Sequence, residues 1–424
     1  MYVFTMRRPR FVCILAACLP AAACETESFE TPAALQEPVM LPSPAGPGSA
    51  EPSLSTSADG KVLLSWIEPS NDAHSLRFSV LDADAWSEPR TIASGTDWFV
   101  NWADFPSLIQ LSDSTLVAHW LQRNGDGTYA YGVRIARSHD GGMTWGAAVT
   151  PHDDSPAEHG FVTLYDAGAG DVGAVWLDGR NYAEGVEVMT LRHATIAPDG
   201  TLDDEHEIDA RVCDCCQTAV AQSEGRLVVF YRDRSEQELR DISMVARENE
   251  GWSAPATLHA DNWQIDACPV NGPQADARGS HVVIAWFTAP DDDPRVNVAF
   301  SSDAGRTFGT PVRVDDGAPA GRVDVLLGAD GSAIVSWLER VDGTAEVRLR
   351  RVSPEGRMAP PLTVTRTGAD RATGFPRMAL SDSAVVLAWT ATEPTDAGAA
   401  AGSDRPASTV RTAQVTLPPP DGDI

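Results

Sequence analysis

Four cysteines lie in two short stretches whose residue types could carry chemistry. Cys213, Cys215 and Cys216 stand within four positions around Asp214, and Cys268 follows about one internal repeat later, at the corresponding place in that repeat. We therefore predict that the four sulfurs form one cluster. If the chain is exported, two disulfides are the first interpretation, although the adjacent Cys215 and Cys216 could pair only as a strained bridge.

The same sulfurs offer two other chemistries. Thiolates bind soft cations such as Cu(I) or Zn(II), and His159 would be a nearby nitrogen ligand if the repeats bring it close. Thiol–disulfide exchange is the third possibility. The spacing Cys-x-Cys-Cys matches no strong zinc motif, and a hydrogen-bonded structural role is the alternative for His159, so the three interpretations stay open.

Acidic residues and arginines recur where apolar segments end. Asp178-Gly179-Arg180 and Arg232-Asp233-Arg234 are two such places, and Glu339 is a third. Carboxylates there are candidates for general acid and base catalysis, which makes Asp178, Asp233 and Glu339 the catalytic candidates. The arginines could hold a carboxylate or phosphate in a bidentate grip, or simply pair with acids on a polar rim.

A further group of residues precedes the apolar segments and completes the candidate ligand site. Two tryptophans in this group could stack on a sugar or form a hydrophobic plug. The candidate ligand-binding residues are Trp98, Trp102, Asp104, His159, Arg180, Arg232, Arg234, Asn271 and Arg371.

A repeat of 51 to 56 residues predicts the elements that position these residues. Each unit has a continuous apolar run, preceded by a turn signal such as Asp59-Gly60, and two further strands follow it. Such a run is expected of a strand covered on both faces. The aromatics that end the runs are Trp66, Trp120, Trp176, Tyr231, Trp286, Trp337 and Trp389.

Seven units of four antiparallel strands predict an all-β, seven-bladed β-propeller, with a six-bladed ring as the alternative. A ring of sheets avoids free edges only when it closes. Residues 38–41 resemble the fourth-strand segments of other units, and the last unit lacks a fourth strand, so we expect residues 38–41 to complete it. One propeller domain then spans residues 38–417, followed by a tail at 418–424.

The N-terminus predicts export. Three arginines precede an apolar run from Phe11 to Ala23, which is too short to span a bilayer, so residues 1–24 read as a signal peptide. Leu15-Ala16-Ala17-Cys18 resembles a bacterial lipobox, and Cys24 ends a poorer match. We expect Cys18 or Cys24 to be lipidated, with residues 25–37 as a flexible tether to the membrane. The protein would then face the periplasm or the cell exterior.

Composition excludes several classes of function. The net charge is −28, and it falls to −31 without the leader, which excludes nucleic acid as an expected partner. Lys61 is the only lysine, which argues against a P-loop or Schiff-base chemistry.

Two hairpins carry the pattern Ser-x-Asp-x-Gly-x-Thr-aromatic, at residues 138–145 and 301–308. They resemble the Asp-boxes, or BNR repeats, of the sialidase superfamily, and the resemblance implies a structural role for Asp140 and Asp303, away from the active site. Sialidases use a tyrosine nucleophile, an acidic pair and three arginines. Here no tyrosine follows Tyr231, and the early arginine motif is replaced by residues 50–54.

The resemblance thus implies the fold without the chemistry of the family. We expect a binding or assembly module that uses the central face, with a glycan, an anionic small molecule or a protein as ligand. A glycoside hydrolase with a divergent site is the first alternative. A metal-binding or redox protein, with Cu or Zn at the cysteines, is the second.

Overall fold

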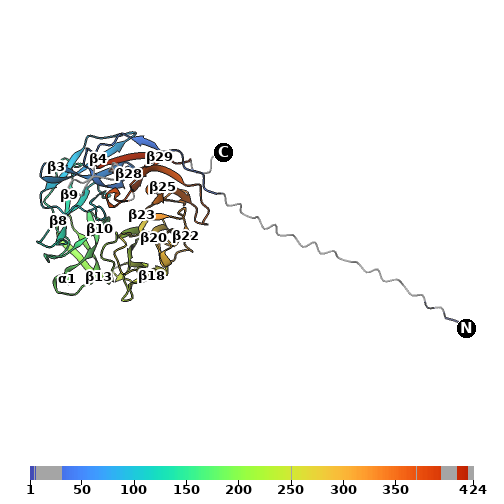
Figure 1. Cartoon of the computed structure of the whole chain (residues 1–424). Coiled ribbons are helices and arrows are strands. Elements are labelled where there is room, and N and C mark those ends of the chain that lie inside the picture. Colours follow the sequence, from blue (N-terminus) through green and yellow to red (C-terminus); the bar gives the residue numbers. More distant parts are fainter. Residues whose placement is uncertain (4, 6–30, 250, 369, 393–407, 419–424) are drawn as a thin grey trace. The chain divides into compact units, whose positions relative to one another are not determined.

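The computed structural model describes residues 1–3, 5, 31–249, 251–368, 370–392 and 408–418. The chain divides into residues 1–31, most of which lie outside the described residues, and Pro32–Ile424, which holds the described strands. In this second unit seven antiparallel sheets stand in a ring (Figure 1), which confirms the seven-bladed propeller and excludes six blades.

Each sheet is one blade, and its strands run outward from the centre of the ring in chain order. Blade one contains β2 (Ala50–Thr56), β3 (Val62–Ser70), β4 (Ala73–Asp82), β5 (Ala85–Trp86) and β6 (Arg90–Gly95). Blade two contains β7 (Ser107–Gln110), β8 (Leu116–Arg123) and β9 (Tyr131–Ser138). Blade three contains β10 (His159–Gly168), β11 (Asp171–Asp178), β12 (Met189–Ile196) and β13 (Leu202–Val212).

The remaining blades follow the same order. Blade four contains β14 (Ala219–Ser223), β15 (Arg226–Arg232), β16 (Ile242–Glu248), β17 (Gly251–Trp252) and β18 (Ala256–His259), and blade five contains β19 (Gln274–Arg278), β20 (His281–Thr288), β21 (Arg295–Ser301) and β22 (Val312–Arg313). Blade six contains β23 (Pro319–Leu327), β24 (Ala333–Val341), β25 (Thr344–Val352) and β26 (Leu362–Thr367). Blade seven contains β27 (Arg377–Leu380), β28 (Ala384–Thr392), β29 (Ser408–Thr416) and, out of chain order, β1 (Val39–Leu41). Short helices α1 (Arg180–Ala183), η1 (Pro290–Asp292) and η2 (Arg371–Thr373) lie in loops.

The fourth strand departs from the expected pattern in three blades. In blades one and four it is broken into two pieces on either side of Pro89 and Pro255, because proline has no N–H to give to the ladder. In blade two it shrinks to a single bridge between Ile135 and Val149.

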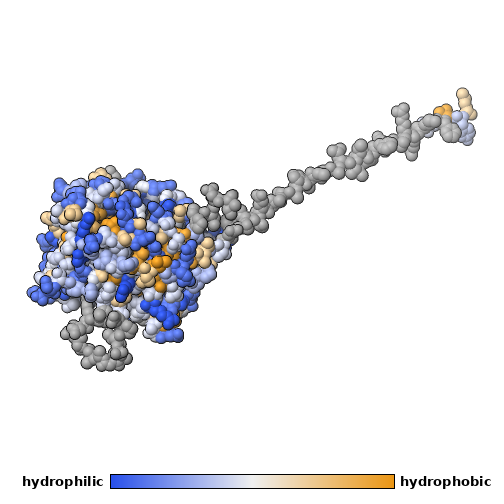
Figure 2. All heavy atoms as spheres, turned by 90° about the horizontal axis from the view of Figure 1, so that it is seen from above, coloured by the Kyte–Doolittle hydropathy of each residue, from blue (hydrophilic) through white to orange (hydrophobic). Residues whose placement is uncertain are grey.

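The second strand of each blade is buried on both faces, as its continuous apolar run predicts. In β20, seven of the eight residues are buried, and Trp286 at its end is fully buried. Facing strands of neighbouring blades enclose such side chains in shared hydrophobic clusters. The face seen in Figure 2 is mainly hydrophilic with smaller hydrophobic areas, since most large apolar side chains lie between the blades.

Three of the tryptophans that end an apolar run make the same kind of polar contact. The indole N–H of Trp66 donates to Glu68 over 2.9 Å, that of Trp176 to Asp178 over 2.7 Å, and that of Trp337 to Glu339 over 2.5 Å. In each case the carboxylate stands two residues beyond the tryptophan. A buried indole N–H needs such an acceptor, so these acids hold the end of a core strand.

The ring closes through β1. Val39, Met40 and Leu41 pair antiparallel with Gln414, Ala413 and Thr412 of β29, so the two ends of the domain share blade seven as predicted. The last residues of the expected tether also touch the domain. Leu35 is buried in the hydrophobic cluster of blades six and seven, and the carbonyl oxygen of Ala33 accepts a hydrogen bond from Arg351 over 3.2 Å.

The two Ser-x-Asp-x-Gly-x-Thr hairpins have the same hydrogen-bond network. Asp140 accepts bonds from the hydroxyls of Ser138 and Thr144 and from the backbone N–H of Thr144, and Asp303 does the same in its hairpin. The aromatic residues that follow, Trp145 and Phe308, meet a phenylalanine of the preceding blade edge to face. Both aspartates therefore have a structural role.

Some predictions fall outside the described residues. They include nearly all of the predicted signal peptide, both candidate lipidation sites Cys18 and Cys24 and most of the tail at 418–424. Within the described residues, no helix has the length and apolar character needed to cross a membrane.

Leu41 and Met40 provide a test of closure within one strand. Leu41 is 7% exposed and packs between blades seven and one, whereas Met40 is 52% exposed. We expect Leu41→Ala to lower the free energy of unfolding by about 2–4 kcal/mol and Met40→Ala to change it by less than about 0.5 kcal/mol. Urea unfolding followed by tryptophan fluorescence measures both, and equal effects would mean that β1 does not close the ring.

Candidate functional site

The candidate site lies on the face where each inner strand begins, which we call the top face. The loops between second and third strands reach the same face, because His159 at the start of β10 pairs with Asp178 at the end of β11. The repeat geometry thus brings together residues that are far apart in sequence, as expected from the sequence.

The four cysteines meet at the entrances to blades four and five. The Sγ atoms of Cys213, Cys215 and Cys216 all lie within 4.8 Å of one another, and Cys215 is joined to Cys268 by a disulfide. Cys213 and Cys216 are free thiols and fully buried, whereas Cys268 is exposed. These four cysteines therefore form one disulfide and two free thiols, and His159 lies not with them but with His152 and Asp153.

Arg232 supplies positive charge to this cluster. Its side chain is 1% exposed, and its guanidinium donates to the backbone carbonyl oxygens of Asn271, Arg240 and Phe287. Burial opposes ionisation of Cys216, but a hydrogen bond from Cys213 and the charge of Arg232 outweigh it and lower the pKa of that thiol. Burial raises the pKa of Cys213 well above its ordinary value.

A second polar group lies beside blades two and three. The hydroxyl of Tyr131 stands 2.9 Å from Asp104 Oδ2 and 2.8 Å from Glu158 Oε1. Asp104 is 3% exposed and also accepts the backbone N–H of Phe161 over 2.8 Å, whereas Glu158 is partly exposed. A single phenolic proton cannot serve two carboxylates at once.

Both carboxyl groups can therefore be hydrogen-bonded to the tyrosine oxygen only when one of them holds a proton and donates it. Burial raises the pKa of Asp104 to about 7 and that of Glu158 to about 8, in each case against the effect of their hydrogen bonds. Glu158 is the member of this pair that reaches the surface, so it is the group that could donate a proton to a bound molecule.

Asp178 and its neighbours form a closed network. The buried Asp178 accepts bonds from Trp176 and Arg180 and lies 3.2 Å from His159 Nδ1. Burial alone would raise its pKa, but the bonds from Arg180 and His159 hold it well below the usual range. Arg180 also pairs with Asp153 and Glu205, so neither Asp178 nor Arg180 is available to a ligand without breaking these contacts.

His159 has a structural environment as well. Its ring stacks on His152 at 3.8 Å, and its Nε2 lies 3.2 Å from Ser155 Oγ. His152 accepts the backbone N–H of Val133 over 2.8 Å and contacts the carbonyl oxygen of Asp153. Although these histidines and Asp153 are close enough to hold a metal, three of the four ring nitrogens have hydrogen-bond partners, and the fourth, His159 Nδ1, lies 3.2 Å from Asp178.

The other catalytic candidates differ in availability. Glu339 is buried and holds Trp337 and the backbone N–H of Ala318. Asp233 is partly exposed and accepts bonds from Ser243 and the backbone of Arg234, and burial raises its pKa. Arg234 pairs with Asp214 and Glu238.

A plug of aromatic and arginine side chains closes the centre of the top face. Trp102 stacks on Phe375 at 5.9 Å, and the guanidinium of Arg322 lies 4.9 Å from the Trp102 ring. The Arg322 guanidinium donates to the carbonyl oxygens of Gly374 and Asp370, and the Arg322 backbone N–H donates to Asn271 Oδ1. Trp98 is not part of the plug, because it stacks on Trp120 between blades one and two, and Arg371 is exposed.

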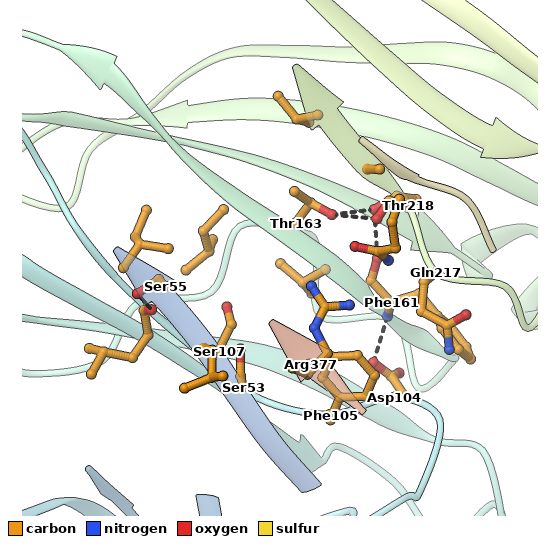
Figure 3. A pocket seen from close by; sticks show the side chains of 18 of the residues that line it. Ser53, Ser55, Asp104, Phe105, Ser107, Phe161, Thr163, Gln217, Thr218 and Arg377 are labelled. Carbon is orange, nitrogen blue, oxygen red and sulfur yellow. Dashed lines mark hydrogen bonds between the residues drawn. The ribbon is translucent and has the colours of Figure 1, made fainter. Parts of the chain in front are cut away.

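Two hollows adjoin the plug. Below it, a cavity of about 200 Å³ follows the axis between inner strands, with Ser53, Ser55, Ser107 and Thr163 around it (Figure 3). On the top face, a pocket of about 230 Å³ is lined by the partly exposed Trp102 with Asn101, Glu51 and Ser408. The second hollow is the one that the partly exposed Trp102 lines.

Comparison with solved structures agrees with this fold. A protein of unknown function from Dyadobacter fermentans has a TM-score of 0.50 and 16% identity, over 91% of this chain and 99% of that one. The endosialidase of phage phi92 has a TM-score of 0.50 and 9% identity, over 92% of this chain and 70% of that one. The Hadza microbial sialidase Hz136 has a TM-score of 0.43 and 14% identity, over 68% and 63%.

The chain shares its fold with the Dyadobacter fermentans protein and the phage endosialidase. No protein-family model matches the sequence, and the comparison with curated proteins gave no match either. At these identities the likeness concerns the fold, so function has to be argued from the site itself.

Four residues of the site were not predicted from the sequence: Tyr131, Glu158, Arg322 and Phe375. Tyr131 begins β9 and Phe375 shortly precedes β27, at the same end of the blades as the predicted site residues. Their position in the repeat could therefore have indicated them. Glu158 directly precedes His159, and only His159 was predicted as a site residue. The shared proton depends on a three-residue contact across two blades, and no sequence pattern indicates it.

The shared proton makes a prediction about pH. Because the folded-state pKa of Asp104 is raised above its unfolded value, its contribution to stability is present at low pH and is lost as pH rises through about 7. Between pH 6 and pH 8 the wild type should lose about 1 kcal/mol of unfolding free energy more than Asp104→Asn does, since one pKa unit corresponds to about 1.4 kcal/mol. Urea unfolding at both pH values measures this difference.

Asp126→Asn is the matched control, because Asp126 is an exposed carboxylate of the neighbouring hairpin. It should follow the wild type at both pH values. A wild type and Asp104→Asn with parallel pH dependence would show that Asp104 carries no proton in this range.

Proposed function

We propose that this protein is an exported propeller that binds a neutral glycan on its top face, at the pocket beside Trp102. The observation that carries the proposal is the partly exposed Trp102, which is held by contacts with Phe375 and Arg322 and lines the pocket together with Asn101. A rigid aromatic face with a few polar neighbours suits the apolar face and hydroxyls of a sugar ring.

The charges of the top face support a neutral ligand. Arg180 and Arg234 are paired with acids, and Arg232 is buried against carbonyl oxygens. The chain as a whole is strongly acidic. An anionic ligand at Arg180 or Arg234 would have to displace a carboxylate and approach against a negative field.

The hairpins support membership of the sialidase superfamily. We propose that residues 138–145 and 301–308 are Asp-boxes, because both have the same side-chain and backbone bonds to the aspartate. The likeness to solved sialidases supports the fold, and the structural role of both aspartates keeps them away from any active site.

A glycoside hydrolase is the second candidate, and Glu158 is the observation that favours it. A partly exposed carboxyl with a raised pKa, beside Asp104 and Tyr131, has the properties of a general acid. Reporter glycosides measure this directly. Turnover by the wild type that is lost in a folded Glu158→Gln variant would replace binding by hydrolysis as the function.

The main prediction concerns Trp102. On an array of neutral and acidic glycans we expect binding to neutral glycans, and we expect Trp102→Ala to weaken it by about 10-fold or more, which corresponds to about 1.4 kcal/mol. Calorimetry with the strongest glycan measures the affinity. Tyr129→Ala, which removes an aromatic side chain that is 60% exposed elsewhere, is the control and should leave affinity unchanged.

Selective binding of sialylated glycans that survives Trp102→Ala would contradict the proposed site. Because Trp102 belongs to the plug, the thermal stability of the variant is measured alongside. Trp102→Phe keeps an aromatic face and should retain most of the affinity, which separates loss of a contact from loss of folding.

We also propose that a lipid holds the protein at a membrane, facing the periplasm or the cell exterior. The lipobox-like sequence before Cys18 and the run before Cys24 support this proposal. Growth with a labelled fatty acid should label the protein, and either Cys18→Ser or Cys24→Ser should abolish the label. Labelling that survives both substitutions together, or no labelling of the wild type, would contradict lipidation at these cysteines.

A further inference from the structure

Two free thiols are buried next to a disulfide that reaches the surface. Cys213 and Cys216 are fully buried, Cys215 lies with its Sγ 3.9 Å from that of Cys213, and the disulfide partner Cys268 is exposed. The glycan pocket beside Trp102 does not involve these residues. This site is therefore independent of the proposed function.

The surroundings of Cys216 favour negative charge on its sulfur. Among the described residues, no carboxylate lies within 4.0 Å of the Arg232 guanidinium, which is buried against three carbonyl oxygens and the ring of Trp263. A buried cation is costly without an opposite charge nearby. The backbone N–H of Asn271 and the charges of Arg232 and Arg240 all act on Cys216, so sulfur can supply that opposite charge.

The distances also suit a cation between the sulfurs. Metal–thiolate bonds are about 2.3 Å long, so two sulfurs on opposite sides of one cation stand about 4.6 Å apart. The sulfurs here all lie within 4.8 Å of one another. This limit is compatible with one ion between the sulfurs of Cys213 and Cys216.

We propose that Cys213 and Cys216 bind one Cu(I) ion as a two-coordinate thiolate site, with the Cys215–Cys268 disulfide intact beside it. Each thiol that carries a proton releases it to solvent as its sulfur–copper bond forms. Two thiolates and Cu(I) leave one net negative charge, which the buried Arg232 balances. Cu(I) is a soft cation that thiolates select.

The number of ligands distinguishes Cu(I) from Zn(II). Structural zinc sites use four ligands in a tetrahedron, whereas the disulfide removes Cys215 and Cys268 from the set of thiolates. The histidines of the top face, His152 and His159, are already hydrogen-bonded. Two thiolates alone therefore favour the ion that accepts two ligands.

Anaerobic titration of the purified protein with Cu(I), in competition with a chromophoric Cu(I) chelator, tests the proposal. Ascorbate keeps the copper reduced, and thiol reductants are left out so that the disulfide persists. We expect one Cu(I) per chain. We expect Cys213→Ser and Cys216→Ser each to lower the affinity by about 100-fold or more, which exceeds the usual effect of removing a residue that only hydrogen-bonds to a metal ligand. The double variant Cys215→Ala/Cys268→Ala removes the disulfide but keeps both ligands, so it should still bind one Cu(I).

X-ray absorption of the copper-loaded wild type keeps the proposal testable if a serine variant fails to fold. A shell of two sulfur atoms is the expected result. A shell of three or more sulfurs or of nitrogen atoms, a Cys213–Cys216 disulfide in the protein isolated from its own compartment, or tighter binding of Zn(II) than of Cu(I) would each overturn it.

Discussion

Closure of the ring is the constraint on which the rest of this structure depends. Each blade covers its neighbours, so an open array would leave the apolar faces of two blades and one sheet edge exposed to water. The three residue pairs between β1 and β29 prevent this, and Leu41 fills the space between blades seven and one. Once the ring is closed, the loops that enter the inner strands must converge, and this convergence is what brings Asp104, Cys213 and Trp102 to one face.

The polar residues of that face largely hold the blades together. Trp176 and Trp337 end their strands against Asp178 and Glu339, and Arg322 ties blade six to the loop that precedes blade seven. These contacts use up the hydrogen-bonding capacity that a catalytic site would need. The accessible groups include Trp102, the carboxyl groups of Glu158 and Asp233, whose pKa values are raised, and Cys268 of the disulfide beside the buried thiols.

The sequence predicted the fold well because its signals repeat. A buried strand ending in an aromatic occurs seven times, and residues 38–41 could be assigned to the last blade because that blade lacked a fourth strand. The site was harder to predict. Register placed Asp178 and Glu339 at the top face, but their bonds to tryptophan depend on side-chain direction. Glu158 became a candidate only through its contact with Tyr131, which also contacts Asp104. Tyr131 is 27 residues from each of the two acids in the sequence. Contacts of this kind leave no local pattern.

The central claim is that the top face binds a ligand at Trp102 while its ion pairs stay intact. A crystal structure of the protein with the glycan that binds most tightly tests this most directly. The account predicts a sugar ring stacked on Trp102, with the pairs of Arg180 with Asp178 and of Arg234 with Asp214 unchanged. A ligand bound to those arginines with the pairs broken, or a glycan cleaved beside Glu158, would contradict it.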